Sequence, residues 1–352
     1  MIILYAILLI LILIGIKFKL NSFNEEYMSR DSTTAIKGIF VILVFFSHFR
    51  SYVDLGEHWY NYYFGTICSW IGQLMVVMFL FYSGYGIVKQ IQKQIGGGYI
   101  KSFLKHRFLP VWIQFAICIC FFIILDVAMG LIAEYNGLQI ALSFTGWTSI
   151  GNSNWFMFVT FALYILVYLS FRFLNFKDIK WNIVIFSVLS CILVVILYIF
   201  KESHWWNTLL CFPLGMWYGY YNDKVEAFMK RPKNYWLTAV PLVLAFLAAW
   251  FVHLRVRNLG KAYIILSLLF ALVVVAVTMK IQIGNSVLNF FGKHVFSIYI
   301  LQRIPMMIFQ DVITNVYLNF VVCFLLTIAI AVGFDFLFGK VKDLLLKPKV
   351  AW

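Results

Sequence analysis

The chain has 352 residues, of which 63% are hydrophobic, 20% are aromatic and only 12% are charged, and its mean hydropathy is +0.91. Soluble domains hold about 45–50% apolar and about 25% charged residues, so this composition excludes a soluble fold and indicates an all-α polytopic membrane protein. The net charge of +14 would suggest a nucleic-acid partner in a soluble protein. Here basic loops beside the membrane explain the charge, and we expect no nucleic-acid partner.

Cysteine and histidine are spread along the chain without the spacing of metal ligands. The six cysteines lie in or beside apolar runs and form no C-x-x-C pair, and the six histidines form neither H-x-x-x-H nor H-E-x-x-H. Thiols in this setting are typical of small packing residues. We therefore expect neither a disulfide framework nor a metal site.

Eleven apolar runs approach or reach the ~20 residues that a transmembrane helix needs. The expected spans are 1–16, 34–53, 68–88, 108–128, 154–171, 182–200, 206–221, 237–253, 262–279, 294–313 and 317–339. Two lysines follow the first span, which lacks a cleavage site and is therefore predicted to be an uncleaved anchor.

Lysine and arginine are distributed unequally between the two sets of alternate loops. One set carries 21 of the 28 basic residues and the other carries 5, while Lys37 and Arg303 lie within spans. Because cytoplasmic loops carry the excess of positive charge, this bias predicts an outer N-terminus and a cytoplasmic C-terminus. We expect a multi-pass protein of the cell membrane, in contact with its lipids.

The second span, Thr33–Arg50, carries two ionisable side chains in an otherwise apolar run. Lys37 and His48 are 11 residues apart, which places them on one helix face about 16 Å apart along the axis. Ionisable groups inside a bilayer usually face a protein interior or a water-filled path. The alternative is that His48 is a core histidine hydrogen-bonded to a neighbouring helix.

The most basic predicted cytoplasmic loop is 89–107, KQIQKQIGGGYIKSFLKHR. Lys101, Lys105 and Arg107 in this loop could dock a polyanionic ligand such as a nucleotide cofactor. Contact with lipid headgroups explains the same charge equally well. The charge pattern alone leaves both interpretations open.

The outer end of the predicted bundle has residues suited to sugars. The loop 129–153 has no lysine or arginine and leads into Asn154 and Trp155. Amides and indole rings fit sugar hydroxyls and sugar faces, although an interfacial aromatic belt has the same composition. Both interpretations stay open at this point.

The tenth span places Tyr299, Gln302 and Arg303 on one face, at i, i+3 and i+4. A guanidinium near the middle of the membrane needs a carboxylate, a carbonyl or a bound anion. A structural ion pair with Asp311 or Asp335 is the alternative to a functional role.

Five segments in chain order share the pattern of one known family. They are KGIFVILVFFSH at 37–48, MVVMFLFYSGYGI with Ser83-Gly84-Tyr85, HRFLP at 106–110, Asn154-Trp155, and FFGKHVFSIYILQ at 290–302. In order and spacing they resemble the R-x10-H, SGY, basic-loop, tryptophan and GK-x-S motifs of the acyltransferase 3 family. The likeness covers 33–339, preceded by an anchor and linker at 1–32 and followed by a basic tail at 340–352.

The resemblance implies an integral-membrane enzyme, of a kind found in bacteria, that moves an acyl group from cytoplasmic acyl-CoA to a glycan or lipid-linked sugar outside. The acyl group would be acetyl, with succinyl as an alternative. His48 would be a general base, because imidazole titrates near physiological pH, or would carry the acyl group covalently. The expected site residues are His48, Lys37 and Arg303 for catalysis; Arg107, Lys105, Lys101 and Ser83 for CoA; and Asn154, Trp155, Tyr299 and Gln302 for the acceptor.

Two positions depart from the family pattern, since Lys37 replaces the usual arginine and Gln302 replaces a frequent histidine. Lysine keeps the charge but loses the planar fork of a guanidinium. The alternative functions are a transporter or flippase of lipid-linked glycans and a non-catalytic subunit of a glycan-assembly complex. The sequence also leaves the acceptor and the oligomeric state open, a homodimer included.

Overall fold

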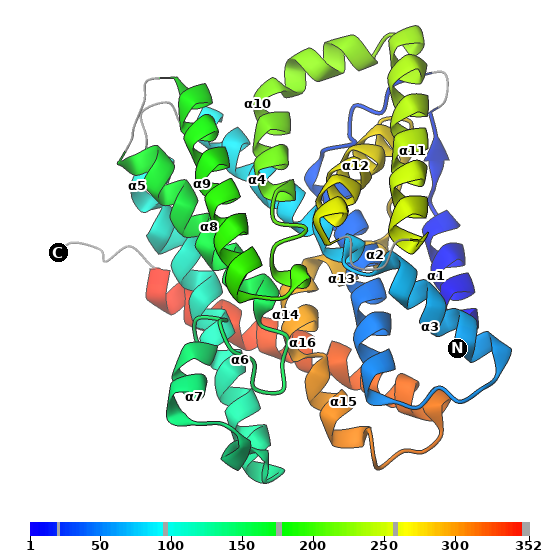
Figure 1. Cartoon of the computed structure of the whole chain (residues 1–352), viewed down its shortest axis with the longest axis vertical. Helices are drawn as coiled ribbons and strands as arrows, with labels where there is room; N and C mark the ends of the chain where they lie inside the picture. The colour runs from blue at the N-terminus through cyan, green and yellow to red at the C-terminus, as the bar shows by residue number, and fades with distance from the viewer. Residues whose placement is uncertain (20–21, 94–97, 174–177, 256–259, 347–352) are drawn as a thin grey trace.

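The computed structural model describes residues 1–19, 22–93, 98–173, 178–255 and 260–346 (Figure 1). These residues are almost entirely helical, because a backbone inside a bilayer must satisfy its own hydrogen bonds. The prediction of an all-α polytopic membrane protein is confirmed. Within these described ranges, seven helical segments are long and apolar enough to cross a membrane, namely Arg30–Tyr52, Trp59–Lys93, Gly98–Ala128, Trp155–Arg172, Ile179–Phe200, Pro232–Arg255 and Val316–Val341. Three shorter apolar helices in the same ranges are Ile3–Leu13, Ala262–Thr278 and Val295–Phe309.

The N-terminal third contains the helix predicted to carry the site. Its elements are α1 (Ile3–Leu13), β1 (Lys17–Phe18), α2 (Arg30–Phe49), the 3-10 turn η1 (Arg50–Tyr52), α3 (Trp59–Ile71) and α4 (Leu74–Lys93). Ser29 caps α2, since its hydroxyl accepts a hydrogen bond from the Ser32 N–H at 3.2 Å.

The middle of the chain begins with the basic segment and ends with two long apolar helices. Its elements are α5 (Gly98–Phe103), the π-helical segment η2 (Leu104–Phe108), α6 (Leu109–Ala128), η3 (Leu131–Glu134), α7 (Gly137–Ser143), α8 (Trp155–Arg172), α9 (Ile179–Phe200) and η4 (Ser203–Trp205). Pro110 lies in the first turn of α6, directly after the π-helical segment η2 in one continuous helical segment, so its missing N–H interrupts the helical hydrogen-bond ladder there.

The last third closes the bundle. Its elements are α10 (Cys211–Met229), α11 (Pro232–Arg255), α12 (Gly260–Thr278), β2 (Ile281–Gln282), α13 (Ser286–Lys293), α14 (Val295–Leu301), α15 (Arg303–Phe309) and α16 (Val316–Leu346). In the view of Figure 1, α16 runs crosswise to the other long helices, and it packs against α14 and α15. The predicted tail 340–352 continues α16 as far as residue 346, and its last six residues lie outside the described part of the chain.

Two predicted spans are divided in the structure. The span 68–88 begins inside α3 and ends in α4, because Gly72 adopts a φ of +48° and ends α3. The span 294–313 is split at Gln302 into α14 and α15. Pro305 has no N–H to donate to the carbonyl of Leu301, so the helical hydrogen-bond ladder is interrupted there.

Loops that the charge pattern assigns to one side of the membrane contact each other. On the side predicted to be outer, the Ile2 N–H donates to the carbonyl of Tyr60 at 3.2 Å. On the opposite side, the Lys19 N–H donates to the carbonyl of Lys280 at 2.8 Å, where β1 and β2 pair antiparallel. These contacts agree with the predicted alternation of the first spans, whereas the side that faces the cytoplasm stays a prediction.

Glycines permit the two closest helix crossings around the predicted site. A Cβ at Gly38 would overlap the carbonyl oxygen of Leu288, where α2 crosses α13. A Cβ at Gly84 would overlap the carbonyl oxygen of Phe212, where α4 crosses α10. Small residues at such crossings let membrane helices approach backbone to backbone, so these glycines fix the positions of α2 and α4.

Candidate active site

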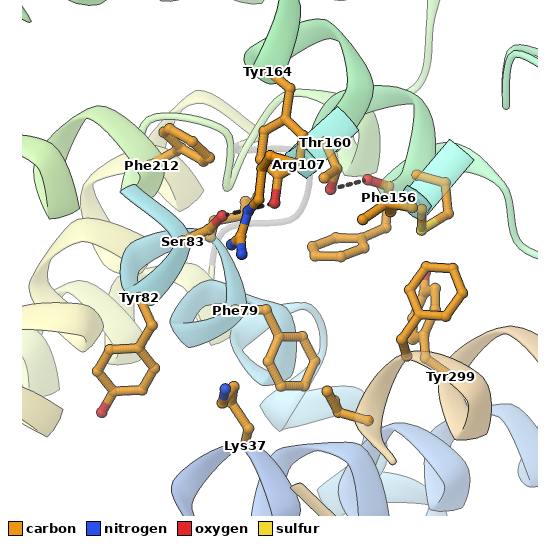
Figure 2. A pocket seen from close by; sticks show the side chains of 15 residues that line it. Lys37, Phe79, Tyr82, Ser83, Arg107, Phe156, Thr160, Tyr164, Phe212 and Tyr299 are labelled. Atoms are coloured by element: carbon orange, nitrogen blue, oxygen red, sulfur yellow. Dashed lines mark hydrogen bonds between the residues drawn. The ribbon is translucent and has the colours of Figure 1, made fainter. Parts of the chain in front are cut away.

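A cavity of about 370 Å³ lies between α2, α4, α8 and α14, with further walls from η2, α6 and α10. Figure 2 shows Ser83, Arg107 and Tyr164 close together, with Lys37 on the opposite side and Phe156 and Tyr299 in another part of the wall. The polar residues of the lining include Lys37, Ser83, Arg107 and Tyr164. The cavity therefore brings together residues of three predicted motifs that are far apart in the sequence.

Two cations face this cavity. Lys37 on α2 and Arg107 on η2 point into it from opposite sides (Figure 2), and Arg107 is a charged neighbour of Lys37. Within the described part of the chain, neither cation forms an ion pair with an acidic side chain. Two cations that face a membrane cavity without an acid partner indicate a site for an anionic ligand.

The segment that presents Arg107 is π-helical, and such segments often occur at functional sites. The Arg107 guanidinium lies over the ring of Tyr164 at 5.7 Å from the centroid, and the Tyr164 hydroxyl is 3.2 Å from that of Ser83. These contacts join Arg107 to Ser83 through one residue of α8. Ser83 and Arg107, both predicted to bind CoA, thus lie together.

Lys101 and Lys105 belong to the same basic segment but do not line the cavity. Both side chains are exposed, Lys101 on α5 and Lys105 on η2. The structure therefore separates Arg107 from the two lysines that the sequence placed beside it. Any role for Lys101 and Lys105 lies outside the cavity wall.

His48 lies beyond the aromatic end of the cavity. Its ring centroid is 6.1 Å from that of Tyr299, and Tyr299 lines the cavity while His48 does not. The Nδ1 atom of His48 is buried and has no hydrogen-bond partner among the described residues. The alternative of a core histidine bonded to a neighbouring helix is therefore not supported by this arrangement.

Arg303 is the first residue of α15. It is a charged neighbour of the His48 ring. Its guanidinium lies over the ring of Tyr52 at 5.8 Å from the centroid, and its buried Nε has no hydrogen-bond partner in the described ranges. Asp335, one suggested ion-pair partner, is instead bound to His294 at 2.5 Å. Among the described residues Arg303 forms no ion pair with Asp311 or Asp335, so the alternative of a structural ion pair with either carboxylate is wrong.

Three of the four predicted acceptor residues lie away from the cavity wall. Asn154 is buried and donates to the carbonyl of Thr148 at 2.6 Å, which holds the preceding loop to the start of α8. Trp155 packs edge-on against His204, with ring centroids 5.7 Å apart. Gln302 is buried and donates to the Tyr299 carbonyl at 2.8 Å. Only Tyr299 lines the cavity.

The sequence did not single out the residues that α8 contributes. Phe156, Thr160 and Tyr164 line the cavity at intervals of four residues, on one face of α8. Thr160 and Tyr164 are polar residues one turn apart in an apolar helix, and this spacing could have indicated that one face of the helix lines a polar site. Phe156 carried no signal, because an aromatic residue in an apolar helix is ordinary.

A second polar cluster holds α14 in place from its other side. Asp335 on α16 binds His294 and accepts a hydrogen bond from the Ser297 hydroxyl, and Gln114 on α6 donates to Asp335 at 3.3 Å. His294 and Ser297 flank Val295 and Phe296, which line the cavity. The cluster therefore positions one wall of the cavity without facing it. Among the described residues, no group of three or more His, Cys, Asp or Glu side chains could hold a metal ion.

Fold and cavity together define the class of protein, a multi-pass membrane protein with a cationic cavity inside its helix bundle. The sequence pattern of the acyltransferase domain matches residues 31–336. The chain belongs to the acyltransferase 3 family and is a membrane acyltransferase. No curated protein and no solved structure matches the chain.

Proposed function

We propose that the chain transfers an acyl group, acetyl in the first instance, from acyl-CoA to a hydroxyl of a surface polysaccharide or lipid-linked sugar. The observation that carries the proposal is a cavity that Lys37 and Arg107 face from opposite sides and that Tyr299, a neighbour of His48, also lines. Because Tyr299 contacts His48, one extended donor could reach from Lys37 and Arg107 towards His48.

The residues of the cavity fit the chemistry of acyl-CoA. Phosphate groups form strong charge-assisted hydrogen bonds with lysine and arginine, which suits Lys37 and Arg107. The rest of the wall is largely apolar and aromatic, which suits the uncharged arm that bears the thioester. Ser83 and Tyr164 supply the hydroxyl groups beside Arg107.

His48 supplies the base for the reaction. In direct transfer its imidazole takes the proton of the acceptor hydroxyl while the oxygen attacks the thioester carbonyl. The carbon–sulfur bond then breaks, and the thiolate leaves and takes up a proton. In the alternative relay, a nitrogen of His48 attacks the thioester carbonyl, and the carbon–sulfur bond breaks as the thiolate leaves. The acceptor hydroxyl then attacks the acyl-imidazole and loses its proton, and the carbon–nitrogen bond breaks to release His48. Both routes need one ring nitrogen of the imidazole to be free, and the Nδ1 of His48 has no hydrogen-bond partner within the described residues.

Unsatisfied polar atoms around His48 support an acceptor rich in hydroxyl groups. The Gln302 Oε1 and the Arg303 Nε are buried without a hydrogen-bond partner in the part of the chain described. Buried polar atoms are costly unless water or a ligand satisfies them. Arg303 could stabilise the oxyanion of the transition state or bind an acidic acceptor.

The proposal is tested by transfer of label from [¹⁴C]acetyl-CoA to the glycan fraction of inverted membrane vesicles. We expect His48→Ala to lower transfer by at least about 100-fold, since a positioned base contributes about 10²–10⁴ to the rate. His58→Ala is the matched control, because His58 stacks on Tyr60 outside the cavity. Undiminished transfer by His48→Ala would show that the catalytic assignment is wrong, and no transfer by the unaltered protein would refute the proposed reaction.

A further inference from the structure

Three aromatic side chains stand at the end of the cavity nearest His48. Phe79 on α4, Phe156 on α8 and Tyr299 on α14 all line it. The ring centroids of Phe79 and Phe156 are 6.1 Å apart, and those of Phe156 and Tyr299 are 5.4 Å apart. Each ring therefore contacts the next, and we name these three residues the aromatic wall.

The aromatic wall separates the cavity from His48. Tyr299 contacts the His48 ring on one side and Phe156 on the other, with centroids 6.1 Å and 5.4 Å away. His48 does not line the cavity, so a thioester held by the Lys37 end can meet His48 only beside these rings. The space between the thioester and the wall is the space left for the acyl group.

The wall is held by contacts that resist displacement. The close crossing of α10 at Gly84 fixes the helix that carries Phe79, and the Ser83–Tyr164 contact joins that helix to the one that carries Phe156. Trp155 packs edge-on against Phe156 with ring centroids 5.7 Å apart. Inserting extra methylene groups against packed rings forces side chains off their preferred rotamers, which is unfavourable.

We propose that the aromatic wall, and Phe156 in particular, limits the donor to short acyl groups such as acetyl and rejects butyryl and longer chains. The proposal rests on the proposed function, since it names the donor class of the same cavity. Phe156 is the specificity determinant because it lies between the other two rings. Tyr299 is less suited to test this role, as it also contacts His48.

The test is displacement of tritium-labelled CoA from the purified protein in lipid nanodiscs. The competitors are unlabelled CoA, acetyl-CoA, butyryl-CoA and hexanoyl-CoA, so that no acceptor is needed. We expect hexanoyl-CoA to bind the unaltered protein at least about tenfold more weakly than acetyl-CoA, since one surplus methylene in a hydrophobic pocket is worth about tenfold or more. In Phe156→Ala the two affinities should come within about threefold of each other.

Phe161→Ala is the matched control, because Phe161 is on the same helix and packs against Phe108 and Phe115, away from the cavity wall. It should keep the discrimination of the unaltered protein. If Phe156→Ala fails to bind CoA at all, Phe79→Ala supplies the same comparison. Equal affinities for all chain lengths in the unaltered protein would refute the proposal that the aromatic wall limits the acyl group. Unchanged discrimination in Phe156→Ala would refute it as well. Absence of CoA binding to the unaltered protein would instead refute the proposed function.

Discussion

Lys37 places its charge in a cavity rather than against lipid or a carboxylate. Arg107 and Arg30 are its charged neighbours, and both repel it. Inside a bilayer such an arrangement is unfavourable unless a ligand or water supplies negative or polar groups. An anion that binds between Lys37 and Arg107 would relieve their mutual repulsion, and this relief would add to the affinity for the anion.

This account predicts that the charge of residue 37 matters more than its shape. Lys37→Met should weaken CoA binding by about tenfold or more, because a hydrogen bond to a charged group contributes about 1.5–3 kcal/mol. Lys37→Arg should retain binding, since it restores the guanidinium usual at this position in the pattern of the family. The measurement is CoA affinity in nanodiscs, with the exposed Lys93→Met as control. Equal affinities for all four proteins would contradict the assignment.

Residues of the site were predictable to the extent that they were polar in apolar surroundings. Lys37 and His48 stood out on one helix, and their common face followed from helical geometry alone. Arg107 could not be separated from Lys105, because both belong to one basic segment. Both lie in the same π-helical turn, and only the packing of that turn against the bundle places Arg107, and not Lys105, on the cavity wall.

At the scale of the elements, two glycine crossings hold the helices that bear the site. Gly292 on α13 meets the carbonyl of Thr34 on α2, and Gly38 on α2 meets the carbonyl of Leu288 on α13. Each helix thus contributes one glycine that lies against a backbone carbonyl of the other, and the pair of helices is held at two points along their crossing. Lys37 adjoins Gly38 in sequence, and its direction depends on this crossing.

A Cβ at the crossing should therefore destabilise the fold. We expect Gly38→Ala to lower the free energy of unfolding by about 1–3 kcal/mol, the usual effect of overpacking, since backbone atoms cannot move aside. Gly86→Ala on α4 is the control, because a Cβ there meets nothing within 4 Å. Thermal unfolding in detergent measures both, and equal midpoints would show that the crossing tolerates a methyl group.

Apolar length predicted the elements well, because a backbone in a bilayer has few alternatives to a helix. The divisions at Gly72 and Gln302 were missed although Gly72 and Pro305 were signals for them, because each lies within a run long enough to cross a membrane. The aromatic wall was missed for a different reason. Phe79 and Phe156 are 77 positions apart in the sequence, and only packing of α4 against α8 brings them together.

For the whole molecule, the cavity and the charge bias describe one direction of transfer. Lys37 and Arg107 belong to the end that the 21-to-5 distribution of basic residues predicts to be cytoplasmic. His48 and Arg303 lie towards the end predicted to be outer. A donor that enters from one side and an acceptor that binds from the other would meet at Tyr299, the residue that both regions share.

The central claim is that this cavity binds acyl-CoA with its charged end against Lys37 and Arg107 and its thioester beside the aromatic wall. A structure of the protein in nanodiscs with CoA, determined by cryo-electron microscopy, tests it most directly. The account predicts density for phosphate groups at the two cations and for the thiol end beside Tyr299. Density for CoA at any other surface, with an empty cavity, would contradict it.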